Sequence, residues 1–257
     1  MRTAVVTGAA QGVGLATVRR LGLSGYEVLA TDIQPLDATL ARLQSEGIRV
    51  RGIVGDVSQE AFAQELAAAV ERDFSAVDVL VNNAGISLIM PAESTTLEQW
   101  QRVMSVNLLG PFLLCRQLGP HMLRRGSGSI VNVASIAGLA GVSHRAAYNT
   151  SKHGLIGLTR TLAAEWGGRG VRVNAVCPGW IKTEMDAKDQ RRGVYTDLDI
   201  VNRVPMARFA STEDVAAAIA YLADPGASGF VNGISLPVDG GWTADASWES
   251  LRVGTRT

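Results

Sequence analysis

The stretch TAVVTGAAQGVGLA, residues 3–16, runs from a short apolar segment through a glycine turn into a helix-forming sequence. Its glycines are Gly8, Gly12 and Gly14, spaced G-x-x-x-G-x-G. Glycine permits a tight turn and close backbone approach to a pyrophosphate, and the helix that follows offers free N–H groups and a positive dipole end. The same glycines would suit a purely structural turn, but their place after the first strand favours dinucleotide binding. Gln11 and Val13 complete the cofactor contacts predicted for this turn.

Alternation of strands and helices continues along the chain. Further β-rich runs, most of them followed by a stretch of helical periodicity, lie at residues 27–31, 48–54, 78–85, 128–135, 171–179 and 233–241. This order predicts an α/β fold: a doubly wound, Rossmann-type parallel sheet of about seven strands with helices on both faces. No linker interrupts the pattern, so we expect a single domain over residues 1–257. In this architecture ligands bind beyond the carboxyl ends of the strands.

The composition excludes several classes of protein. The 257 residues include 24 Lys and Arg against 24 Asp and Glu, which favours neither nucleic acid nor an anionic membrane as partner. No run approaches the roughly 18 apolar residues of a membrane span, so a cytoplasmic protein is expected. Cys115 and Cys177 are predicted to be buried free thiols. The three histidines lack metal-ligand spacing, so no catalytic metal is expected.

Asp32 ends the second predicted strand, where a carboxylate accepts hydrogen bonds from the adenosine ribose and repels a 2′-phosphate. No Arg or Lys lies next to it, so NAD is the expected cofactor rather than NADP. Asp56, with Val57, follows the third strand and is predicted to touch the adenine edge. An equally simple interpretation makes Asp56 the N-cap of a helix that starts near Ser58.

Six motifs in order resemble the short-chain dehydrogenase/reductase family. They are TGAAQGVG (7–14), NNAG (82–85), Asn107 in SVNLLGPF, Ser135 in VNVAS, YNTSK (148–152) and CPGWIKT (177–183). The likeness extends from residue 3 to about residue 242. It implies hydride transfer involving nicotinamide and a catalytic set at Ser135, Tyr148, Lys152 and Asn107.

Elementary chemistry supports this carry-over. Tyr148 and Lys152 stand at positions i and i+4, so they share a helix face. A free phenol has a pKa of about 10, and a neighbouring ammonium lowers it towards the range of a useful base. Lys152 is also expected to bind the nicotinamide ribose, while Ser135 holds the substrate oxygen. Asn107 is expected to hold a water that links Lys152 to solvent, unless its amide only satisfies the local backbone.

The resemblance also implies further cofactor contacts. NNAG is expected to place Asn83, Ala84 and Gly85 beside the adenosine ribose. At the end of the sixth strand, the resemblance implies contacts to the nicotinamide and phosphates from Pro178, Gly179, Ile181 and Thr183. Tyr148 and Lys152 belong to the cofactor set as well as to the catalytic one.

The region around 180–211 is the predicted substrate lid. It is crowded with charge, which favours a small polar substrate such as a sugar or polyol, with Lys182, Arg191 and Arg192 as charge partners if the substrate is anionic. The expected substrate contacts are Ser135, Ala137, His144, Tyr148, Asn149 and Trp180. Many of the charges in this region would equally suit a solvated surface.

The resemblance also implies a homotetramer. The helices around 99–124 and after Tyr148 carry more Leu and Val than one sheet face must cover, notably at Val103, Val106, Leu109, Leu113, Leu114, Leu155, Leu158 and Leu162.

Two alternative functions stay open at this point. One is an NADPH-dependent 3-oxoacyl-thioester reductase, against which Asp32 argues. The other is a regulator that binds NAD(H) without turnover, against which the intact Ser135, Tyr148 and Lys152 set argues.

Overall fold

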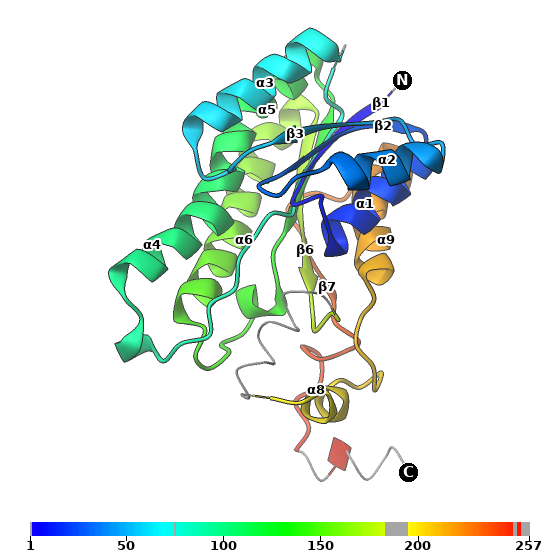
Figure 1. Ribbon diagram of the computed structural model, residues 1–257. Helices are drawn as coiled ribbons and strands as arrows, with labels where there is room; N and C mark the ends of the chain where they lie inside the picture. The colour runs from blue at the N-terminus through cyan, green and yellow to red at the C-terminus, as the bar shows by residue number, and fades with distance from the viewer. Residues whose placement is uncertain (1, 75, 183–194, 249–250, 253–257) are drawn as a thin grey trace.

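The computed structural model describes residues 2–74, 76–182, 195–248 and 251–252. A seven-stranded parallel sheet with the order β3-β2-β1-β4-β5-β6-β7 forms its centre, which confirms the predicted doubly wound single domain (Figure 1). The strands are β1 (Arg2–Thr7), β2 (Tyr26–Asp32), β3 (Val50–Val54), β4 (Val79–Asn82), β5 (Gly128–Val133), β6 (Val171–Pro178) and β7 (Ser235–Val238). The strand order reverses at β1, so a crevice opens beyond the carboxyl ends of β1 and β4.

Helices cover both faces of the sheet. Figure 1 shows α1, α2 and α9 on one face and α3, α5 and α6 on the other. The helices are α1 (Gly12–Leu23), α2 (Asp37–Ser45), α3 (Glu60–Asp73), α4 (Leu97–Met104), α5 (Gly110–Arg125), α6 (Ala146–Trp166), α8 (Asp197–Arg203), α9 (Thr212–Ala223) and α10 (Pro225–Ser228).

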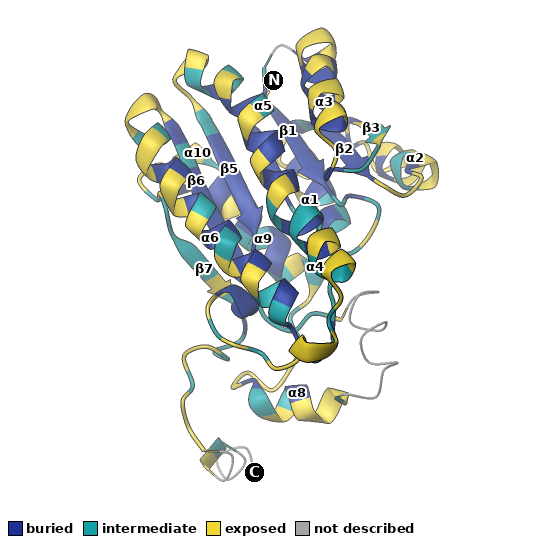
Figure 2. Cartoon of the chain, turned by 90° about the vertical axis from the view of Figure 1, so that its left-hand side faces the viewer, coloured by how far each residue is buried: buried dark blue, intermediate teal, exposed yellow. Residues whose placement is uncertain are grey.

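Burial follows this layering, because a strand covered on both faces must be apolar on both. Val5 packs in the layer under α3 and α5, whereas its neighbours Ala4 and Val6 pack under α1 and α9. Figure 2 shows the buried strands between helices whose outer surfaces are exposed. Most of the leucines and valines named above as surplus lie in this core, including Leu113, Leu114, Leu155 and Leu162. Their abundance is therefore explained by one chain, and Leu109, which is 43% exposed, is the clearest exception.

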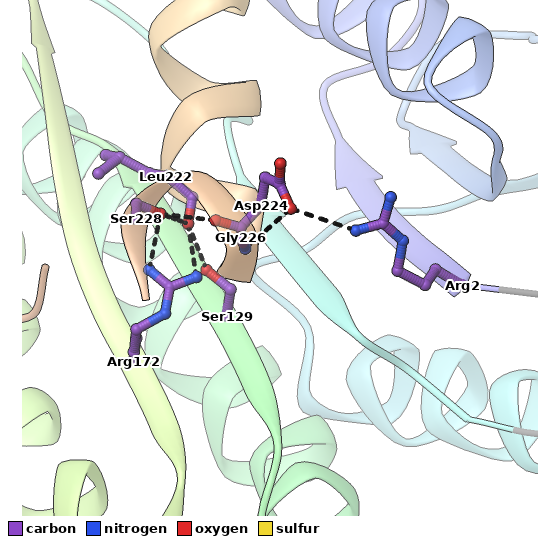
Figure 3. Close-up of polar contacts among 7 residues, drawn as sticks. All are labelled: Arg2, Ser129, Arg172, Leu222, Asp224, Gly226 and Ser228. Atoms are coloured by element: carbon purple, nitrogen blue, oxygen red, sulfur yellow. Dashed lines mark hydrogen bonds and ion pairs between the residues drawn. The ribbon is translucent and has the colours of Figure 1, made fainter. Parts of the chain in front are cut away.

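The amino ends of β5 and β6 are closed by a polar cluster (Figure 3). Arg172 donates to the Leu222 carbonyl (2.9 Å) and to Ser228 Oγ (3.1 Å). Ser129 Oγ also donates to the Leu222 carbonyl, at 2.9 Å. These bonds satisfy the Leu222 carbonyl in the last turn of α9 and join α9 and α10 to the sheet. This cluster has a structural explanation, and the chemistry lies at the opposite edge.

The predicted lid is described only at its two ends, residues 180–182 and 195–211. The second part contains α8, which begins with a capping box between Thr196 and Asp199. Across the described residues, no helix has the length and apolar character needed to cross a bilayer.

Candidate active site

A cavity of about 580 Å³ opens at the carboxyl ends of the strands. Residues that follow β1, β2, β3, β4, β5 and β6 all line it, together with one face of α6. The cavity therefore gathers segments that are far apart in the sequence. One end is formed by the glycine turn and Asp32, and the other by Ala137, Tyr148 and Trp180.

The glycine turn lies at the first end. Gly8 and Gly12 both have positive φ, 66° and 56°, which a side chain would disfavour. Gly8, Gln11, Gly12 and Val13 line the cavity, as predicted for cofactor contacts. Gly14 does not line it: a Cβ there would lie 1.9 Å from the Gly8 carbonyl oxygen. Its hydrogen lets α1 pack against the turn, so Gly14 shapes the site without facing it.

Asp32 is held rigidly at the end of β2. Its Oδ2 accepts from the Ala10 N–H (2.9 Å) and its Oδ1 from the Gln34 N–H (3.0 Å). The residue is 8% exposed and lines the cavity. A carboxylate fixed beside the glycine turn can accept hydrogen bonds from the two hydroxyls of an adenosine ribose, and it would repel the 2′-phosphate of NADP.

Asp56 and Val57 line the same end. Asp56 Oδ1 accepts from the Ser58 N–H and hydroxyl, at 2.9 and 2.7 Å, and its Oδ2 accepts from Arg102 at 3.0 Å. Burial raises the pKa of Asp56, but the bonds from Ser58 and Arg102 outweigh burial and leave the pKa below its usual value. Helix α3 begins only at Glu60, so Asp56 caps a turn before the helix rather than the helix itself.

The loop after β4 is tied to the glycine turn. Asn83 Nδ2 donates to the carbonyls of Thr7 (2.9 Å) and Gly8 (3.1 Å). Thr7 Oγ1 accepts from the N–H groups of Asn83 and Ala84. Asn83, Ala84 and Gly85 all line the cavity, as do Pro178, Gly179 and Ile181 after β6. Thr183 lies outside the described residues.

Ser135, Tyr148 and Lys152 line the cavity together. Ser135 follows β5, and its Oγ accepts from the Ala137 N–H at 3.1 Å. Tyr148 and Lys152 lie one turn apart on α6, with Lys152 Nζ 5.7 Å from the centroid of the Tyr148 ring. Lys152 Nζ also donates to the Val133 carbonyl at 2.8 Å. The structure thus brings together three residues from two elements, in the arrangement the sequence predicted.

Burial alters the acidity of two groups here. Loss of hydration lowers the pKa of Lys152 to about 8, and nearby Cys177 opposes this only in part. Burial likewise raises the pKa of the Cys177 thiol to about 11. Cys177 is therefore a neutral thiol near pH 7, as expected for a core residue. Lys152, in contrast, can gain and lose a proton at moderate pH.

Asn107 does not line the cavity but lies behind it, fully buried, in a π-helical turn, Ser105–Leu109. Its Oδ1 accepts from the Ile86 N–H (2.8 Å), and its Nδ2 donates to the Ile86 carbonyl (2.9 Å) and to Ser151 Oγ (3.1 Å). The side chain thus satisfies the local backbone, which was the alternative interpretation.

Two predicted substrate contacts do not line the cavity. His144 is exposed, with φ 59°, and its carbonyl accepts from the Met90 N–H. Asn149 Nδ2 faces the Ala140 carbonyl at 3.4 Å. Both are neighbours of the tyrosine helix start in sequence, but one residue turns the helix by about 100° and moves a side chain off the shared face. Ala137 and Trp180 do line the cavity, as predicted.

The sequence interpretation missed several residues at this end: Ile86, Ser87, Val142, Arg145 and Tyr195. The sequence position of Arg145 could have suggested that it lies near Tyr148, because it precedes Tyr148 by three residues at the start of the same helix. Its burial could not have been predicted, because the burial depends on a loop that is distant in the sequence. In the part of the chain that the structure describes, no group of three His, Cys, Asp or Glu side chains could hold a metal.

Comparison with known proteins identifies the family. A family model described as enoyl-(acyl carrier protein) reductase matches residues 8–243, a range that contains the described cavity-lining residues and the six strands β2 to β7. The chain belongs to the short-chain dehydrogenases/reductases. It is therefore an oxidoreductase with the nicotinamide-binding fold of that family.

Relatives of this short-chain dehydrogenase/reductase act on varied substrates. D-threitol dehydrogenase of Mycolicibacterium smegmatis is 39% identical over 247 residues, covering 94% of this chain and 93% of the relative. 2-(R)-hydroxypropyl-CoM dehydrogenase of Xanthobacter autotrophicus is also 39% identical, covering 95% and 99%. A gluconate 5-dehydrogenase from Burkholderia cenocepacia, solved in complex with NADP and tartrate, has a TM-score of 0.89 and 32% identity over 95% and 96% of the two chains.

Proposed function

We propose that this enzyme oxidises a secondary hydroxyl of a small sugar or polyol with NAD, and reduces the corresponding ketone. The observation that carries this proposal is that Ser135, Tyr148 and Lys152 share one cavity with the glycine turn and Asp32. A bound nicotinamide would supply hydride acceptance and donation. The protein's own residues would bind, orient and move the proton.

In this proposal Tyr148 is the acid/base. During oxidation its phenolate takes the proton of the substrate hydroxyl, and during reduction the phenol returns it. The Nζ of Lys152 lies 5.7 Å from the centroid of the Tyr148 ring, and in its protonated form the Lys152 ammonium stabilises the Tyr148 phenolate. Ser135 donates to the substrate oxygen and steadies the charge that develops there. Asn107 positions these groups by holding Ile86, which lines the cavity.

The preference for NAD rests on Asp32. Its carboxylate is fixed by two backbone N–H groups and cannot swing away from a 2′-phosphate without losing them. The nearby lining residues Ile33 and Gln34 offer no positive charge. Because the relative from Burkholderia was solved with NADP, the cofactor is the part of the proposal that most needs measurement.

The proposed substrate class draws on the relatives and on the cavity. D-threitol dehydrogenase and gluconate 5-dehydrogenase act on polyhydroxylated molecules, as their names state. The substrate end of this cavity carries polar groups, including Ser87, Arg145 and Tyr195. A site that hydrogen-bonds several hydroxyls rejects analogues that lack them.

A screen tests this function directly. Sugars, polyols, hydroxy acids and simple alcohols are offered with NAD and with NADP, and the absorbance of the reduced cofactor is followed. We expect polyhydroxylated substrates to be preferred, with kcat/KM for NAD at least about tenfold above that for NADP. Faster reduction of an acyl thioester with NADPH would establish the acyl reductase instead. Cofactor binding with no turnover of any substrate would indicate the regulator.

We also propose a homotetramer in the cytoplasm. The support is the family and an exposed apolar hollow lined by Trp100, Met104, Leu108, Leu109 and Phe112. Leu109 and Phe112 are 43% and 41% exposed, which suits a surface buried by another subunit.

A further inference from the structure

Arg102 lines the cavity next to Asp56 but comes from a different element. Asp56 follows β3, whereas Arg102 lies on α4, 46 residues further along the chain. Its Nη1 donates to Asp56 Oδ2 at 3.0 Å and to Ser58 Oγ at 3.3 Å. The ion pair therefore joins α4 to the loop after β3, at the edge of the cofactor site.

The strand order predicts which part of a dinucleotide meets this ion pair. Outward from the crevice, β1 ends at the glycine turn, β2 ends at Asp32, and β3 ends two residues before Asp56. A pyrophosphate belongs over the glycine turn, and the adenosine ribose belongs at Asp32. The adenine ring continues outward from that ribose, so its place is over the end of β3.

The surroundings of this position suit a flat base. Val57 and Val106 line the cavity and belong to one core cluster. Arg102 contacts Asp56, and a Cβ on Gly110 would lie 3.1 Å from Val57, so Val106, between them in the sequence, lies against the same loop. The two valines offer apolar surface to a ring, while the ion pair supplies polar groups at the edge, a combination that is common in ligand sites.

Asp56 keeps one position for a further donor. Its Oδ1 accepts two bonds, from the N–H and the hydroxyl of Ser58, at 2.9 and 2.7 Å. Among the described residues, Oδ2 accepts from Arg102 alone. A carboxylate oxygen has two lone pairs, so Oδ2 can accept one more hydrogen. The exocyclic amino group of adenine is a donor of the kind that this position requires.

We propose that Arg102 is a specificity-determining residue of the cofactor site, because it fixes Asp56 Oδ2 where that oxygen accepts from the adenine amino group. Ser58 holds one oxygen of the carboxylate and Arg102 holds the other, so the group cannot turn to follow a differently placed donor. Arg102 acts through Asp56 and is therefore a positioning residue. The inference rests on the dinucleotide binding of the proposed function, and it holds for NAD and NADP alike because both contain adenine.

A cofactor with an altered base tests this inference. Nicotinamide hypoxanthine dinucleotide carries an oxygen in place of the adenine amino group, and its donor is the N1–H at the neighbouring ring position. A fixed Asp56 carboxylate faces that oxygen and does not reach the N1–H. Wild type is expected to bind the reduced analogue at least about tenfold more weakly than NADH, as measured by titration of nicotinamide fluorescence.

Substitution of Arg102 should remove this discrimination. In Arg102→Met the carboxylate of Asp56 can turn towards the N1–H, so the two dissociation constants should come within about threefold of each other. Arg102→Lys keeps a charged donor and should restore part of the ratio. Arg116→Met is the matched control, because this exposed arginine of α5 pairs with Glu60 and does not line the cavity. It should keep the wild-type ratio.

A substitution of Asp56 tests the contact with the base itself. Asp56→Asn offers a donor as well as an acceptor, so it can face either the amino group or the oxygen. The ratio of the two dissociation constants should therefore approach one in this variant. Circular dichroism of every variant checks that the fold is kept.

Three results would overturn the inference. Equal affinities of wild type for the two cofactors would show that the base is not read at this edge. Equal losses for both cofactors in Arg102→Met would give Arg102 only a general effect on affinity, and a wild-type ratio in Asp56→Asn would place the base elsewhere. In each case oxidation of polyols by wild type would leave the proposed function standing. Failure of wild type to bind either cofactor would remove the proposed function together with the inference.

Discussion

The charged form of Lys152 is destabilised by burial in the folded protein. Burial lowers the pKa of its ammonium from 10.5 to about 8, so the folded chain releases this proton before the unfolded chain does. Between about pH 8 and 10.5 the unfolded state therefore binds more protons, and stability rises with pH across that window. Below pH 8 both states hold the proton and the full cost of burying the charge is present.

Substitution of Lys152 tests whether burial of its charge makes the stability of the protein rise with pH. The free energy of unfolding of wild type minus that of Lys152→Met should increase by up to about 3 kcal/mol as pH rises from 8 to 10.5, because only wild type has the titrating group. Urea unfolding of both proteins at several pH values measures the difference, and contributions from groups that do not interact with Lys152 cancel. A difference that stays flat, or falls with pH, would show that Lys152 is not desolvated as the structure indicates.

The place of a single residue in the site was predictable where it depends on neighbouring residues in the sequence. Tyr148 and Lys152 share a face by helix geometry, and Asp32 ends a strand beside the glycine turn. Arg145 was not predicted, because its burial depends on Ser87 in a loop 58 residues away. Asn149 was assigned to the substrate because it follows Tyr148, although a helix turns adjacent side chains apart.

At the scale of elements, the turn between β1 and α1 depends on close backbone packing. A Cβ at Gly14 would lie 1.9 Å from the Gly8 carbonyl oxygen and 2.6 Å from Asn83 Nδ2. Gly14→Ala must therefore displace α1 or the turn, and with it the N–H groups that face the cofactor.

The expected result is a combined loss. Gly14→Ala should weaken NADH binding by at least about tenfold and lower the free energy of unfolding by about 1–3 kcal/mol. Gly25→Ala is the matched control, since its φ of 87° is strained for alanine while no atom lies within 4 Å of the added Cβ. It should lower stability by about 1 kcal/mol and leave NADH affinity unchanged. Fluorescence titration and urea unfolding give both quantities; equal NADH affinities for the two variants would exclude the proposed role of Gly14.

Element types were predictable from periodicity, but their interruptions were not. The helix predicted around residues 99–124 consists in the structure of α4, a π-helical turn and α5 in succession. Pro111 lacks the N–H that an uninterrupted α-helix would need, and in the π-helical turn before it Asn107 Oδ1 accepts from the Ile86 N–H. Helix α8 lies in the predicted lid, for which no helix was predicted, although Thr196 and Asp199 stand at the spacing of a capping box.

At the scale of the whole molecule, the sheet and its crevice were predictable because seven alternations permit few arrangements. The oligomeric state was not, since the apolar helices counted as surplus mostly serve the core of one chain. The proposed tetramer is instead supported by the family and by the exposed apolar hollow around Leu109 and Phe112.

A substitution in this hollow tests the assembly. Wild type is expected to sediment at four times the 27.1 kDa mass of the chain, and Phe112→Glu should produce dimers or monomers, because a buried charge without a partner opposes association. Sedimentation equilibrium with circular dichroism as a check on folding gives the answer. A folded Phe112→Glu protein with the wild-type mass would place the interface elsewhere.

The central claim is that Tyr148 transfers the proton in an NAD-dependent oxidation, and one comparison tests it most directly. The rate of NADH formation on the best polyhydroxylated substrate is measured for wild type and Tyr148→Phe over a range of pH, with NADH affinity measured alongside. Tyr148→Phe is expected to lose roughly 100-fold or more in kcat, to keep its NADH affinity, and to lack the rise of the wild-type rate with pH. A variant that retains near wild-type turnover, with the same pH dependence, would contradict it.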